Sequence, residues 1–138
     1  GVNGALDPEK VEDAIRDPEN VHHPRTALIC MENTHNAAGG TVIGLDNIEK
    51  VRKVADKYGV AMHLDGARIF NAALALKVEA REIAKYFDSV QFCLSKGLSA
   101  PFGSLVVGSR EFIKYATHMR KILGGGMRQC GIMRPQDT

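Results

Sequence analysis

Three groups of polar residues in this chain hold side chains that can bind charged ligands or transfer protons. They are Glu32–His35, Asp65–Arg68 and Ser95–Gly97, and each follows an apolar run. Carboxylates, an imidazole, a guanidinium and a lysine amine can together bind an anionic ligand and move protons. If the three apolar runs are neighbouring parallel strands, their carboxyl ends bring the three groups to one edge of a sheet. We therefore predict a ligand site at that edge.

Lys96 is the residue in these groups that can bond covalently to a carbonyl compound. It follows the apolar run 90–94 and precedes Gly97, in a loop that also contains Pro101 and Gly103. Partial desolvation at a sheet edge frees a lysine amine to form a Schiff base with an aldehyde, and we expect Lys96 to be partly buried in this way. The alternative is a solvated loop lysine, which the motif Ser-Lys-Gly alone does not exclude.

Asp65 ends an apolar run, where a carboxylate is costly to bury without a partner. A pyridine nitrogen is one such partner, because the carboxylate keeps the nitrogen protonated. The alternative is that Asp65 caps a helix that begins near Arg68. Arg68 can face the same cleft and bind a carboxylate or phenolate oxygen, and its alternative role is an ion pair with Asp65.

Histidines are further candidates for proton transfer. His22 and His35 are the two that we keep as functional candidates. We expect His63 to point away from Asp65 on its strand and to be structural. We expect His118 to be solvated on the polar side of a helix.

The elements that must position these residues follow from alternating hydrophobic periods. Strands alternating with helices predict an α/β fold with a mostly parallel sheet and flanking helices. The run 26–31 is continuous and apolar, which predicts a strand buried on both faces. Gly59 is placed to cap the preceding helix, and Gly124–Gly126 to end the last one. The predicted strands are 26–31, 60–64, 90–94 and 105–107, and the predicted helices are 8–16, from 46 to 58, from 68, 80–87 and 109–123.

Composition excludes several classes of protein. A chain of 138 residues with 44% hydrophobic and 25% charged residues predicts one globular domain. A net charge of +2 without clusters of lysine or arginine argues against nucleic-acid or membrane-surface binding. Cys30, Cys93 and Cys130 lack the spacing of a zinc site or disulfide framework, which predicts reduced thiols in the cytoplasm and no metal. No apolar run approaches the roughly 18 residues of a membrane span.

Four sequence blocks resemble the signature blocks of the low-specificity L-threonine aldolases. These enzymes use pyridoxal 5'-phosphate (PLP) and belong to the aspartate-aminotransferase superfamily, the type I fold. The resemblance covers about residues 25–132. It implies that 1–132 is part of a large PLP-binding domain lacking both ends of the family's chain, and that 133–138 is an atypical tail. The blocks are Met31–Asn36, His63–Asn71, Cys93–Leu98 and Gly124–Gln129.

The resemblance implies roles for the three central residues. Lys96 would bind PLP as a Schiff base, Asp65 would pair with the pyridine nitrogen, and Arg68 would help to bind the cofactor or the substrate carboxylate. The implied substrate is a β-hydroxy amino acid, L-threonine or L-allo-threonine, which is cleaved to glycine and acetaldehyde. The resemblance also implies a cytoplasmic enzyme that forms a homo-oligomer at full length.

Further residues receive roles from the same resemblance. His22 would lie near the substrate hydroxyl and act in catalysis, although His23 and His35 compete for that role. Lys121 and Arg128 flank the glycine run and would bind the cofactor, in the same subunit or across a subunit boundary.

Two other functions stay open for this chain. It can be a truncated, non-catalytic module that pairs with a full-length protomer or is inert, or a different PLP-dependent β-eliminating lyase. Residues 1–25 do not resemble the family's phosphate-binding loop, so we expect this chain alone to bind PLP weakly and to have little aldolase activity. A nucleotide-binding domain is disfavoured, because no Gly-x-Gly-x-x-Gly follows the first strand.

Overall fold

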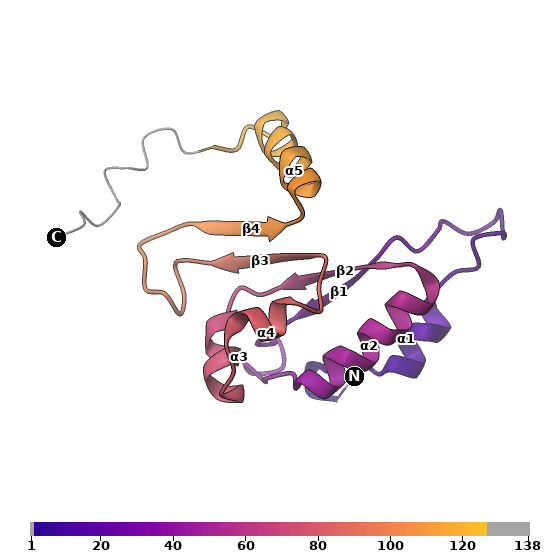
Figure 1. Ribbon diagram of the computed structural model, residues 1–138, viewed down its shortest axis with the longest axis horizontal. Coiled ribbons are helices and arrows are strands. Elements are labelled where there is room, and N and C mark those ends of the chain that lie inside the picture. The colour runs from indigo at the N-terminus through magenta and orange to yellow at the C-terminus, as the bar shows by residue number, and fades with distance from the viewer. Residues whose placement is uncertain (1, 127–138) are drawn as a thin grey trace.

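The computed structural model describes residues 2–126, which form a four-stranded sheet with helices around it. β1, β2 and β3 are parallel, and β4 runs antiparallel to β3. The predicted α/β fold with a mostly parallel sheet is therefore confirmed (Figure 1). The strands, in their order across the sheet, are β1 (Leu28–Glu32), β2 (Ala61–Asp65), β3 (Ser89–Cys93) and β4 (Ser104–Gly108).

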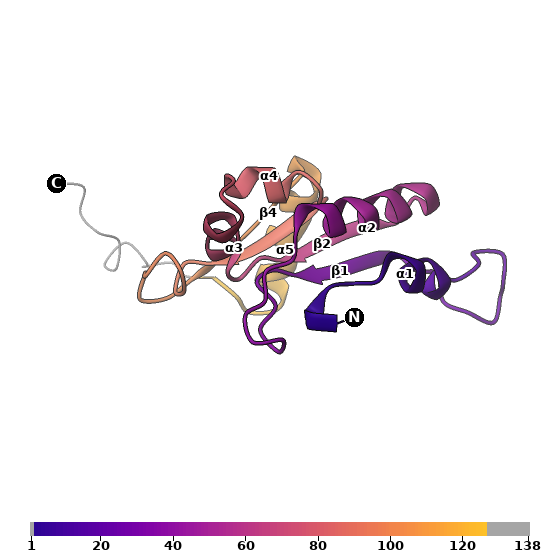
Figure 2. The same ribbon diagram turned by 90° about the horizontal axis from the view of Figure 1, so that it is seen from below.

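The helices lie close to their predicted positions in the sequence. In Figure 2, α2, α3 and α4 lie on one face of the sheet. Within residues 2–126, none of the helices has the length and apolar character needed to cross a membrane. The helical elements are η1 (Val2–Gly4), α1 (Pro8–Ala14), α2 (Leu45–Tyr58), α3 (Ile69–Leu76), α4 (Ala80–Ala84) and α5 (Arg110–Ile122).

Local signals explain where these helices begin and end. The carboxylate of Asp7 accepts a hydrogen bond from the Glu9 N–H at the start of α1 (3.1 Å), and Gly59 ends α2 in the left-handed conformation, as predicted. The prediction that α1 reaches residue 16 was wrong, because Ile15 is already extended. α4 is also shorter than predicted, because the chain leaves the helix after Ala84 and continues in a turn at residues 85–86.

The hydrophobic core lies on the sheet face that α2, α3 and α4 cover. The prediction that the first strand is buried on both faces was wrong, since Leu28 and Cys30 on its other face are exposed. Within the described residues, helices cover only one face of β1. We call the other side of the sheet the open face, on which α5 lies against β4. The buried strand residues of the covered face are Ile29, Met31, Met62, Leu64 and Val90.

His63 lies on the open face together with Asp65. The prediction that it points away from Asp65 was wrong, because residues two apart on a strand share a face. The burial of β2 follows this alternation, with Met62 and Leu64 buried on the covered face. The ring Nδ1 of His63 lies 2.8 Å from the Ser89 hydroxyl on β3, which agrees with a structural role.

Asp88 ties the amino ends of β2 and β3 to α2. One carboxylate oxygen accepts hydrogen bonds from the Met62 N–H (2.7 Å) and from the Arg52 guanidinium (2.9 Å). The hydrogen bond from Met62 is the main cause that holds the pKa of the Asp88 carboxyl below its ordinary value. The stability that Asp88 contributes is therefore present above the pKa of an unfolded aspartate and is lost as pH falls through the lower folded pKa.

We expect Asp88→Asn to lower the free energy of unfolding at pH 7 by about 1 kcal/mol, because more than half of this side chain is exposed and solvent screens its charge. The difference from the parent should begin to shrink below about pH 4, the ordinary pKa of an aspartate, and should vanish only below the lower pKa of the folded Asp88 carboxyl. Urea unfolding at several pH values measures this. Asp13→Asn, an exposed residue of α1, is the control, and an equal loss in both variants at pH 7 would contradict the expectation.

Candidate active site at the carboxyl ends of the strands

The parallel strands bring the predicted groups to one edge of the sheet. Glu32 pairs in register with Asp65, and Asp65 pairs with Gln91 on β3. The Gly66 N–H donates to the Gln91 carbonyl (2.7 Å), which continues the pairing of the two chains past the end of β2. The loop that carries Lys96 follows β3 at this same edge. The predicted convergence of the three polar groups at one sheet edge is confirmed.

Asp65 is exposed at this edge, and its carboxylate is oriented by the turn that follows it. Oδ1 accepts a hydrogen bond from the Ala67 N–H (3.1 Å). Within residues 2–126, Oδ2 accepts no hydrogen bond and Asp65 has no ion pair with Arg68. The N-cap of α3 is Arg68, so Asp65 does not cap the helix itself. Neither structural alternative for Asp65 therefore describes the geometry.

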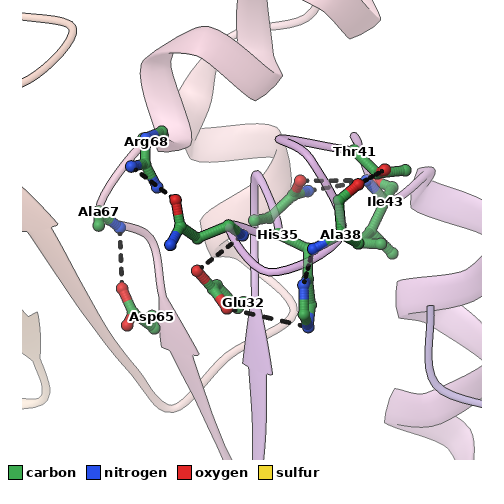
Figure 3. A network of polar contacts seen from close by, with 10 residues as sticks. Glu32, His35, Ala38, Thr41, Ile43, Asp65, Ala67 and Arg68 are labelled. Carbon is green, nitrogen blue, oxygen red and sulfur yellow. Dashed lines mark hydrogen bonds and ion pairs between the residues drawn. The ribbon is translucent and has the colours of Figure 1, made fainter. Parts of the chain in front are cut away.

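Arg68 extends toward the loop after β1 instead of toward Asp65. Its Nη2 donates a hydrogen bond to Oδ1 of Asn36 (3.0 Å). The Asn36 N–H in turn donates to Oε1 of Glu32 (3.0 Å). Figure 3 shows Arg68 and Asp65 apart, each with its own partner. This network links the ends of β1 and β2.

The loop 33–43 is closed by buried hydrogen bonds. The side chain of Asn33, which is only 1% exposed, donates to the Ile43 carbonyl (3.0 Å) and accepts from the Ile43 N–H (3.1 Å). Nδ1 of His35 accepts from the Ala38 N–H (3.2 Å), and its Nε2 lies 3.8 Å from the Glu32 carboxylate. Because Nδ1 accepts this bond, the proton of a neutral His35 is on Nε2. These contacts favour a structural role for His35 in the loop.

Lys96 lies in an exposed loop over residues 95–99. The expectation that the sheet edge partly buries this lysine was wrong for the described chain, since Lys96 and its neighbours in the loop are exposed. Two backbone hydrogen bonds shape this loop: the Ser99 N–H donates to the Lys96 carbonyl (2.9 Å), and the Leu94 N–H donates to the Gly103 carbonyl (2.9 Å). A Cβ at Gly97 would lie 2.5 Å from Oδ1 of Asn71, so glycine lets the loop approach α3 closely.

Cys93 lies on the open face at the end of β3, and its side-chain contacts were not predicted. Its sulfur accepts hydrogen bonds from the Ser104 hydroxyl (3.6 Å) and from the Gln91 amide (3.6 Å). The Ser104 hydroxyl, followed by Gln91 and the ammonium of Lys96, lowers the pKa of the Cys93 thiol. Cys93 lies on the face that also carries Asp65, three residues before Lys96. No residue type or spacing in the sequence signals the contact of Cys93 with Ser104.

We expect Cys93 to be alkylated by iodoacetamide at lower pH than an ordinary thiol, since only the thiolate reacts. Ser104→Ala should raise the pKa of Cys93 and slow its alkylation roughly threefold near neutral pH, as expected when a hydrogen bond to a charged group is lost from an exposed position. Mass mapping of the labelled peptides measures both rates. Cys30 is the internal control, and an equal slowing at Cys30 would contradict a local effect.

Other predicted residues are not brought to this edge. His22 is exposed in the connection between α1 and β1, where its N–H donates to the Asn20 side chain (3.0 Å). This connection lies at the opposite end of the sheet from the loop 94–103 (Figures 1 and 2). Lys121 is exposed in the last turn of α5, and Arg128 lies outside the described residues, as does the predicted tail.

A cavity of about 540 Å³ lies at this opposite end of the sheet. Its lining includes Arg16, Arg25 and Tyr58, all of them exposed residues. Asp17 also lines it, but Lys96 and Asp65 do not. The candidate active site is therefore the edge of the sheet at the carboxyl ends of the parallel strands, where Asp65 and the Lys96 loop lie. Within residues 2–126, no group of three or more metal-binding side chains gathers at one place.

Comparison with known proteins agrees with this geometry. The chain matches the family model of the β-eliminating lyases over residues 1–135. Low-specificity L-threonine aldolase 1 of Arabidopsis thaliana is 52% identical over 132 residues, which are 95% of this chain and 37% of that protein. The low specificity L-threonine aldolase of Escherichia coli K12 is 46% identical over 132 residues, 96% of this chain and 38% of that protein.

A solved structure shows the same fold. The threonine aldolase of Leishmania major superposes with a TM-score of 0.75 at 23% identity, over 90% of this chain and 36% of that one. The chain thus spans little more than a third of the length of these relatives. The family match and the two relatives confirm what the four sequence blocks predicted: this chain belongs to the β-eliminating lyase family and is similar to its threonine aldolases.

Proposed function

We propose that this chain supplies the cofactor lysine and its surroundings to a PLP-dependent lyase of the threonine aldolase type. One observation carries the proposal. Asp65 and the loop that carries Lys96 follow neighbouring parallel strands and meet at the same edge of the sheet. The relatives named above and the family match support the same function.

The residues present fit PLP. The cofactor has an aldehyde, a pyridine nitrogen and anionic oxygens, and the site offers an amine, a carboxylate and a guanidinium. Oδ2 of Asp65 is free to accept a hydrogen bond within residues 2–126, and Oε1 of the adjacent Gln91 is buried there without a partner. Lys96 is exposed, so its amine is accessible to an aldehyde from the open side.

Each residue would have a separate task. The Lys96 amine would hold the cofactor by a covalent bond. The Asp65 carboxylate would keep the pyridine nitrogen protonated, and Arg68 would bind an anionic oxygen of the cofactor or the carboxylate of the amino acid. PLP, when bound, supplies an electron sink for the pair of electrons released when a bond at the amino-acid Cα breaks. The proposed products from L-threonine or L-allo-threonine are glycine and acetaldehyde.

The base that takes the proton of the substrate hydroxyl is assigned to His22 on resemblance alone. Within one chain, its loop enters the sheet at the end opposite to Lys96 (Figure 1). In this arrangement we propose that His22 acts in a site of a second copy of the chain. The protein would then be a homo-oligomer in the cytoplasm, with Lys121 and Arg128 as further cofactor contacts.

A chimaera tests the proposed function, because the chain spans only 37% of the Arabidopsis relative. In this chimaera, the 132 matching residues of that relative are replaced by those of this chain. We expect it to release acetaldehyde from L-allo-threonine, whereas the 138-residue chain alone should bind PLP weakly and release little. A folded chimaera that cleaves neither isomer of threonine but eliminates the side chain of aromatic amino acids would favour the other lyase class instead.

A further inference from the structure

We propose that Asn36 is a positioning residue that holds Arg68 away from Asp65. It rests on the proposed function in one respect: Asp65 must stay unpaired because it would bind the pyridine nitrogen. A guanidinium three residues from a carboxylate at a turn is an ordinary ion-pair partner. In the described chain, however, Arg68 donates to Asn36 Oδ1 at 3.0 Å and forms no ion pair with Asp65.

The loop that carries Asn36 is a firm support for this contact. The Asn36 N–H is held by the Glu32 carboxylate at 3.0 Å, at the end of β1. The loop behind it is closed by the two buried hydrogen bonds between Asn33 and Ile43 and by the hydrogen bond from the His35 N–H to the Thr41 carbonyl (2.8 Å). These hydrogen bonds hold the backbone from which the Asn36 side chain extends to Arg68. Figure 3 shows the labelled residues of this loop, among them His35, Thr41 and Ile43.

The acceptor on Asn36 is a neutral amide oxygen, so the contact orients Arg68 without neutralising its charge. A carboxylate at this position would pair fully with Arg68 and neutralise it. An amide oxygen orients the guanidinium with one hydrogen bond and leaves its charge and its other donors for an anionic ligand. At the same time, the unpaired oxygen of Asp65 stays available to a pyridine nitrogen. One asparagine thus keeps two oppositely charged neighbours separate.

NMR of the cofactor-free, full 138-residue chain tests the separation directly. The side-chain Nε–H signal of Arg68 is recorded in the parent, Asp65→Asn, Asn36→Ala and the double variant. We expect Asp65→Asn to leave this signal unchanged in the parent and to shift it once residue 36 is alanine, because Arg68 then turns to Asp65. Equal shifts in both backgrounds, or none in either, overturn the proposal.

A second readout connects the contact to cofactor binding. In the chimaera, Asn36→Ala should raise the dissociation constant of PLP about tenfold, which is the scale of one hydrogen bond to a charged group. In an Arg68→Ala background the same change should have no further effect, and Asn36→Asp, which keeps an acceptor, should hold Arg68 away from Asp65 in the NMR comparison. An undiminished effect without Arg68 would mean a general loosening of the loop and overturn the proposal. If the parent chimaera binds no PLP, the proposed function fails, and the NMR comparison on the 138-residue chain alone decides the role of Asn36.

Discussion

Lys96→Ala should abolish covalent attachment of PLP and reduce threonine cleavage by the chimaera at least about 10³-fold, the scale on which removal of a covalent catalytic group acts. No other lysine is placed to replace it within residues 2–126, because Lys96 alone follows a parallel strand at the edge that carries Asp65. Non-covalent binding through Asp65 and Arg68 should persist at reduced affinity. Acetaldehyde release and the absorbance of bound PLP measure the two effects.

Lys50→Ala is the matched control for this substitution. Lys50 is exposed on α2 and makes no ion pair within the described residues. The Lys50→Ala substitution should leave both cofactor absorbance and turnover within about twofold of the parent, because surface substitutions of this kind change stability little. If Lys96→Ala retained full turnover, the assignment of the cofactor lysine would be wrong.

Asp65→Asn is expected to lower kcat of the chimaera by about 10²- to 10⁴-fold, the range for removing a group that controls a proton in catalysis. The amide keeps the size of the side chain and can still accept the Ala67 N–H, so the fold should be retained. It cannot hold a proton on a pyridine nitrogen by charge, and the electron sink is therefore weakened. KM and the dissociation constant of PLP should change less than kcat.

The control for the Asp65 substitution is Asp46→Asn, in the exposed first turn of α2. Steady-state kinetics with L-allo-threonine and a thermal unfolding curve should be recorded for both variants. Equal thermal stability with a selective fall in kcat for Asp65→Asn is the expected pattern. A fall in stability that accounts for the lost activity would instead assign Asp65 to the turn before α3.

Hydrophobic periodicity was sufficient to predict most of the fold. The helical spacing of Ile48, Val51 and Val54 predicted α2, and all three are buried as expected. The short apolar runs gave strands within two residues of their positions. The same runs did not show how many faces are covered, since a continuous apolar sequence such as 26–31 also occurs where one face is open. Coverage depends on elements elsewhere in the fold, which local sequence does not record.

The candidate site was predictable where strand order alone decides it. Asp65 and the Lys96 loop converge because they follow neighbouring parallel strands. The error for His63 came from counting the strand period, since a spacing of two keeps it on the face of Asp65. The contacts of Arg68 with Asn36 and of Cys93 with Ser104 join residues 32 and 11 positions apart. Spacing along one chain does not reveal such pairs.

The most direct test of the central claim is borohydride reduction of the chimaera with bound PLP, followed by mass mapping of its peptides. We expect reduction to fix one pyridoxyl group on the peptide that contains Lys96. Lys96→Ala should lack both this adduct and the absorbance band of covalently bound cofactor. An adduct on another lysine, with Lys96 unmodified, would contradict the assignment of this site.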